Sequence, residues 1–163
     1  MTNNININFI FQFNNKKRSD NFFVLFIVSF IVFLGLAFYF VATNKTWELI
    51  VDIVIAVSYF ALMTQVRPSF FEMLVTDEQI QVNFYTLFTV ARNYQSVEMK
   101  LYQLKDFQII SKAGGLRKEL ILSVESRFGL ADYPPVSVSI VNKTEIERIK
   151  KVLNQILENN KRM

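Results

Sequence analysis

The sequence predicts a membrane α plus cytoplasmic β protein, in which a two-helix transmembrane hairpin carries a small β-barrel or bent sheet capped by a C-terminal helix. Two apolar segments, residues 22–42 and 47–66, follow each other with only four residues between them. Beyond Pro68, apolar and polar residues alternate in short runs, which is typical of strands. The last segment repeats apolar residues at helical spacing. The expected parts are an N-terminal strand (1–14), the hairpin (15–67) and the β domain (68–163).

Each apolar segment has about 20 residues, which is long enough for a helix to cross a hydrocarbon core of ~30 Å. The link 43–46 is so short that the two helices must be antiparallel. The basic run 16–18 precedes the first helix and Arg67 follows the second, whereas the link carries only Lys45. Because Lys and Arg stay on the cytoplasmic side, both termini are expected there. A signal peptide would have an apolar core of roughly 7–15 residues, which is too short to fit this pattern.

The N-terminal segment is expected to be an ordered strand. Residues 4–9 alternate polar and apolar side chains, and residues 10–13 remain rich in β-branched and aromatic types. Ile5, Ile7 and Phe9 would face a core. Since both ends of the hairpin emerge on the same side, this strand would join the cytoplasmic sheet, and the hairpin would be an insertion within the β domain.

The β domain is expected to begin with a strand pair. Residues 71–75 and 79–84 alternate on either side of the turn 76–78. Gly114 and Gly115 predict a tight turn with positive φ angles. Further strands are expected at residues 91–99, 106–112, 118–126 and 135–141.

The last segment predicts a helix over residues 144–158. Thr144 and Glu147 have the spacing of a capping box. One apolar stripe follows at helical spacing and is expected to pack on the sheet. Its residues are Ile146, Ile149, Val152, Leu153, Ile156 and Leu157.

Composition limits the classes of function. Residues 67–163 contain fourteen Lys and Arg against eleven Asp and Glu, too balanced for a double-stranded nucleic-acid partner. Cysteine and histidine are both absent, which removes thiolate chemistry, the usual zinc ligands and the commonest general base. No nucleotide-binding or hydrolase motif is present. We therefore expect no enzyme activity, no catalytic residue, no metal and no cofactor.

Three polar residues of the second apolar segment share one helical face: Glu48, Asp52 and Tyr59. Asp52 would lie ~7 Å inside Trp47, where a carboxylate must be paired, hydrated or protonated. One interpretation is that Asp52 reaches the outer interface or hydrogen-bonds across the hairpin, in which Ser29 would lie level with Tyr59. The other is a polar face that lines a pore, which requires a homo-oligomer because two helices cannot enclose one.

Three cations flank the glycine turn: Lys112, Arg117 and Lys118. Such a hairpin could hold a phosphate group through charge-assisted hydrogen bonds. Facing a bilayer, each cation would gain about 1 kcal/mol from an anionic leaflet. The structural alternative is an ordinary solvated turn, because Glu119 is adjacent and Lys and Arg are common at such positions.

The order of these elements resembles the bacterial pleckstrin-homology-like, YcxB-like, two-transmembrane membrane proteins. The residues that carry the resemblance are the turn 75–80, the approach to a middle strand at 102–107 and the helix 142–157. The resemblance covers nearly the whole chain and implies a bent sheet capped by the helix, in the bacterial inner membrane. The chain is also similar to anti-phage effectors in which two membrane helices are joined to a β-barrel that senses a cyclic oligonucleotide.

The favoured hypothesis is a membrane-anchored cytoplasmic interaction or sensing module without catalytic activity. Its expected partners are the lipid bilayer and either a phosphate-bearing small ligand or a protein. The alternative is a cyclic-nucleotide-gated, oligomeric, membrane-disrupting effector of an anti-phage defence system.

Overall fold

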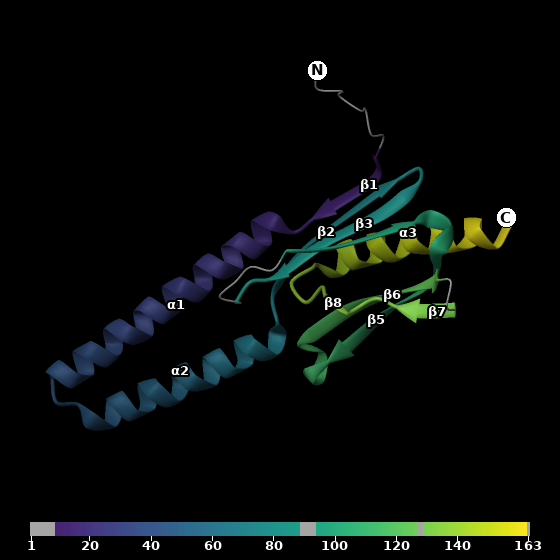
Figure 1. Ribbon diagram of the computed structural model, residues 1–163. Helices are drawn as coiled ribbons and strands as arrows, with labels where there is room; N and C mark the ends of the chain where they lie inside the picture. The colour runs from purple at the N-terminus through teal and green to yellow at the C-terminus, as the bar shows by residue number, and fades with distance from the viewer. Residues whose placement is uncertain (1–8, 89–93, 127–128, 163) are drawn as a thin grey trace, which may run out of the picture.

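A computed structural model describes residues 9–88, 94–126 and 129–162 of the chain. Two long helices lie side by side and project from a domain in which a third helix lies against two sheets (Figure 1). The elements are β1 (Phe9–Asn14), α1 (Lys16–Ala42), α2 (Thr46–Val66), β2 (Ser69–Thr76), β3 (Gln79–Thr86), β4 (Gln95–Lys100), η1 (Leu101–Gln103), β5 (Leu104–Lys112), η2 (Ala113–Gly115), β6 (Arg117–Ser126), β7 (Gly129–Asp132), β8 (Val136–Ser137) and α3 (Lys143–Arg162).

The two long helices, α1 and α2, form the expected antiparallel hairpin, and both are long and apolar enough to cross a membrane. Their apolar side chains are largely exposed, for example 70% for Phe38, which is unlike the core helices of a soluble protein. Between the helices, the ring of Phe60 meets Phe26 edge to face at 5.3 Å. The helix α2 ends at Val66, as Pro68 predicts, because a proline ring cannot continue a helix.

The strands form two antiparallel sheets. One has the order β1-β2-β3-β4; in the other β6 pairs with β5, β7 and β8. Because β1 lies beside β2, with Phe13 opposite Met73, the helical hairpin is inserted between two neighbouring strands of one sheet. Phe13 packs against the core, as does Phe11. Of the residues expected to face the core, Ile5, Ile7 and the side chain of Phe9 lie outside the described part.

The helix α3 lies against the inner faces of both sheets. Its buried side chains Ile149 and Leu153 belong to the same core as Phe71 and Leu120, one from each sheet. All six residues of the predicted stripe are buried or packed against this core, so the amphipathic pattern is confirmed. The sheets do not close on each other within the described residues, so a barrel is not confirmed.

Two features of the domain differ from the expectation. A strand was predicted over residues 135–141, but β8 holds only Val136 and Ser137. The chain then turns, because the N–H of Val141 donates to the carbonyl of Val138 at 3.1 Å. The short strand β7 was not predicted, since no alternation marks it. The predicted strand 91–99 begins outside the described residues, and β4 starts at Gln95.

The start of α3 also differs from the predicted capping box. The helix begins at Lys143, and the N–H of Asn142 donates to Glu145 Oε2 at 2.9 Å. Glu145 therefore takes the role expected of Glu147, which instead accepts a hydrogen bond from Lys150. Glu145 is favoured because the same oxygen pairs with Arg18 of α1 at 2.9 Å.

The junction between the hairpin and the domain is held by a buried polar clasp formed by Asn15, Ser19 and Ser69. The Asn15 amide donates to the Ser69 carbonyl at 3.0 Å. Its Oδ1 accepts the N–H of Phe71 at 2.8 Å and the hydroxyl of Ser19 at 3.0 Å. The clasp thus ties the start of α1 to the start of β2, directly after α2.

Asn15→Ala is expected to lower the free energy of unfolding by about 2–3 kcal/mol, because it leaves the buried N–H of Phe71 and the carbonyl of Ser69 short of a partner. Asn14→Ala is the matched control. Asn14 is the exposed neighbour of Asn15, and its substitution is expected to change the free energy of unfolding by less than about 0.5 kcal/mol. Denaturant unfolding of the detergent-solubilised chain measures both. Equal losses for the two variants would contradict the clasp.

Candidate functional site

A basic cluster lies where the β5–β6 hairpin approaches the end of α2 (Figure 1). We define it as Arg67, Lys112 and Arg117. Arg67 directly follows α2 and has a left-handed backbone, with φ of 44°. Its carbonyl accepts the hydroxyl of Ser137 from β8 at 2.8 Å, which fixes the end of α2 against the second sheet. The cluster therefore joins the base of the helical hairpin to the tip of a strand hairpin.

A buried carboxylate organises this cluster. The side chain of Glu119 on β6 is only 1% exposed. Its Oε2 pairs with Lys112 Nζ at 2.8 Å, and its Oε1 pairs with the Arg117 guanidinium. Lys112 and Arg117 are opposite each other on β5 and β6, so all three side chains share one face of the sheet. One negative charge thus holds two positive charges in place.

The positive charges of the cluster are not fully compensated. Burial lowers the pKa of the Arg117 guanidinium, and the nearby charge of Arg67 lowers it further. An arginine remains protonated despite such a shift. The charged Arg117 side chain is therefore destabilised by its desolvation and by repulsion from Arg67. In addition, the Nε of Arg117 is buried and has no hydrogen-bond partner within the described chain. An anion beside Arg67 and Arg117 would relieve the repulsion.

The structure brings together two of the three predicted cations, Lys112 and Arg117. Lys118 lies on the opposite face of β6, the face that carries the core residue Leu120, while its N–H donates to Ser139 Oγ. The sequence reasoning missed Arg67 as a member and Glu119 as the buried centre. The spacing of Arg117 and Glu119, two residues apart on a strand, is the signal that places both on one face.

The polar residues of α2 share one side of the helix but differ in exposure. Asp52 is buried although its neighbours on α2 are exposed. The Tyr59 hydroxyl donates to Ser29 Oγ at 3.2 Å across the hairpin, so these two residues are level, as expected. Glu48 is exposed. Tyr59 therefore contacts α1 of its own chain in this arrangement, and the oligomeric role of the three residues stays a prediction.

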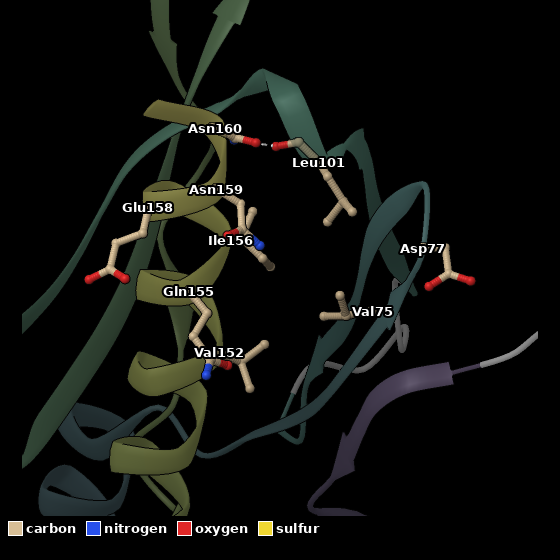
Figure 2. A pocket seen from close by; sticks show the side chains of 9 residues that line it. All are labelled: Val75, Asp77, Leu101, Val152, Gln155, Ile156, Glu158, Asn159 and Asn160. Atoms are coloured by element: carbon tan, nitrogen blue, oxygen red, sulfur yellow. Dashed lines mark hydrogen bonds between the residues drawn. The ribbon is translucent and has the colours of Figure 1, made fainter. Parts of the chain in front are cut away.

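A groove of about 620 Å³ lies at the opposite end of the domain, between α3 and the β2–β3 turn (Figure 2). Val75, Val152 and Ile156 form its apolar floor, and its only charged lining residues within the described chain are Asp77 and Glu158. Figure 2 shows the side chain of Asn160 directed at Leu101, whose carbonyl accepts its hydrogen bond at 2.7 Å. Since its charges are acidic, this groove does not suit a phosphate-bearing ligand, whereas the basic cluster does.

Comparisons of the chain with protein families, with curated proteins and with solved structures find no significant match. The chemistry of the site therefore rests on the residues themselves.

The burial of Glu119 makes a direct prediction about stability. Glu119→Ala is expected to cost about 3 kcal/mol of unfolding free energy, because it leaves Lys112 and Arg117 beside Arg67 without a counter-charge. Glu125→Ala on the same strand is the matched control. The Glu125 side chain is 62% exposed, so its ion pair with Lys105 contributes less than about 1 kcal/mol to stability. Denaturant unfolding compares the two. A cost for Glu119→Ala no larger than that for Glu125→Ala would refute the organising role.

Proposed function

We propose that this protein is a membrane-anchored, non-catalytic interaction or sensing module. The helices α1 and α2 anchor it in the bacterial inner membrane, and both termini lie in the cytoplasm. The observation that carries the proposal is the insertion of an exposed apolar hairpin between two adjacent strands of one sheet. Such a domain has no flexible linker to its anchor.

Exposure and charge support the anchor. The exposed apolar surface of α1 and α2 requires a nonpolar surrounding. The basic residues 16–18 and Arg67 lie at the base of the hairpin, while Lys45 is the only cation at its tip. Trp47 at the tip is 73% exposed, as suits an indole at the far membrane interface.

Three contacts couple the domain to the hairpin and support a sensing role. The clasp joins α1 to β2. The ring of Phe88, after β3, lies 4.2 Å from that of Phe26 on α1. Arg18 pairs with Glu145 at the start of α3. Because these contacts come from three elements, a partner that shifts the sheets or α3 would also shift the helices.

The arrangement of the domain supports a pleckstrin-homology-like fold of the YcxB-like kind. Two antiparallel sheets enclose a core whose open side is covered by a C-terminal amphipathic helix. A fold of this kind does not by itself identify a ligand. The ligand chemistry is inferred from the basic cluster, which suits a phosphate group.

We prefer the anchor over the gated effector because of the contacts between α1 and α2. Tyr59 bonds to Ser29 and Asp52 is buried within the single chain, so a polar pore lining would require both helices to rotate. The absence of histidine and cysteine in the sequence supports a non-catalytic role.

The topology is tested by cysteine labelling, for which the natural absence of cysteine is an advantage. Asn44→Cys, at the hairpin tip, is expected to react with a membrane-impermeant thiol reagent added to cells with a permeabilised outer membrane. Asn159→Cys on α3 is expected to react only after the inner membrane is lysed. The reversed pattern would overturn the cytoplasmic assignment.

Asp52→Leu separates the anchor from the effector. For an anchor, this variant is expected to insert normally and to be slightly more stable, because removal of a carboxylate favours membrane insertion by about 3 kcal/mol. Dye release from vesicles, with and without cyclic oligonucleotides, is expected to be absent for both proteins. Release by the wild type that is lost in Asp52→Leu would instead support the oligomeric effector.

A further inference from the structure

The basic cluster and the base of the hairpin lie at the same level of the molecule. Arg67 is the first residue after α2, and its charge acts on Arg117 at the start of β6. Where α2 leaves a membrane, Arg67 lies among the lipid headgroups. The tip of the β5–β6 hairpin therefore reaches headgroup depth as well (Figure 1).

The tip has the composition of a membrane-contacting turn. Leu116 is 50% exposed and directly precedes Arg117. The positive φ angles of Gly114 and Gly115 form the tight turn, and the space around both glycines is open. An exposed leucine beside cations combines nonpolar contact with attraction to anionic lipid.

The charges and donors of the cluster match a phosphodiester. Its three cations are opposed by one carboxylate, Glu119, whose two ion pairs hold Lys112 and Arg117 on one face. A guanidinium binds phosphate oxygens in a forked geometry that an ammonium cannot provide.

Aromatic residues of the first sheet lie at the same end, and among them Tyr94 is 59% exposed. Phe70 and Tyr85 stack with ring centroids 4.9 Å apart, and Tyr94 lies 5.6 Å from Tyr85. Partial desolvation, followed by the charge of Glu72, raises the pKa of Tyr94. Neutral aromatic side chains are enriched at membrane interfaces. The end of the domain beside the hairpin thus carries aromatic residues on one sheet and cations on the other.

We propose that the tip of the β5–β6 hairpin docks on the anionic leaflet in which its own helices are anchored. Leu116 enters the interface, and Lys112, Arg117 and Arg67 hold the phosphodiester of an anionic phospholipid headgroup. This inference rests on the proposed membrane anchor and deepens it, since it names the ligand class. Docking would fix the domain against the membrane and make its position depend on the charge of the leaflet.

The test uses the full chain with Leu116→Cys carrying a polarity-sensitive fluorophore, reconstituted in lipid nanodiscs. In phosphatidylcholine discs that contain phosphatidylglycerol, the emission is expected to shift to the blue relative to phosphatidylcholine alone. Inorganic phosphate added to neutral discs is expected to cause no shift. The same label on Asn159→Cys, at the far end of α3, serves as the position control and is expected not to respond.

Charge variants in the labelled chain test the cations. Arg67→Gln removes one of the three cations that hold the headgroup and is expected to lower the docking equilibrium roughly fivefold. Lys112→Gln is a second variant, and it is expected to lower the docking equilibrium by at least the same factor. Lys105→Gln is the matched control, because this residue lies at the other end of β5 and pairs with Glu125, and it is expected to have no effect.

The outcomes separate this inference from the proposed function. No difference between neutral and anionic discs, or equal losses for Arg67→Gln and Lys105→Gln, would overturn the docking. A shift caused by inorganic phosphate in neutral discs would replace the lipid by a soluble phosphate ligand. If Asn44→Cys and Asn159→Cys show the expected labelling in cells while Leu116 gives no shift, the anchor stands and only the docking fails.

Discussion

The hydrogen bonds of Asn15 are the constraint on which the rest of the structure depends. One side chain joins the last residue before α1 to the backbone of β2, 54 residues later at Ser69. It thereby sets the register of β1 against β2 and the separation of the two helices at their base. A buried side-chain amide is stable only when its hydrogen-bond partners are present. The arrangement of the junction is therefore specified by hydrogen bonds as well as by apolar packing.

The two ends of the domain are built differently because of this constraint. At the hairpin end, the fixed exit of α2 places Arg67 beside Arg117, and the buried Glu119 compensates only part of the resulting charge. At the far end, Asn160 holds the end of α3 through hydrogen bonds to the carbonyls of Leu101 and Leu104, beside the groove. The charge at one end and the groove at the other are consequences of the same topology.

The sequence could predict the elements with strong periodicity. Three elements could be predicted in this way, because burial imposes a regular pattern on each: the two apolar helices, the β2–β3 pair and the apolar stripe of α3. The pattern failed at β7, which pairs with β6 without alternation, and after Ser137, where the hydrogen bond from Val141 to Val138 turns the chain. For the site, Lys112 and Arg117 could be predicted from the glycine turn. Arg67 could not, since its place in the cluster depends on the docking of α2 against β8 through Ser137.

The insertion of the hairpin between neighbouring strands has a consequence for biosynthesis. The strand β1 leaves the ribosome first, yet its partner β2 is made only after both helices. At a synthesis rate of about 5–20 residues per second, β1 waits roughly 3–10 s with an unpaired edge. For that time its aromatic side chains are exposed, and pairing can begin only once the helices have left the insertion machinery. The first strand of the domain is therefore among the last to fold, and this interval is when the chain is most open to misassembly.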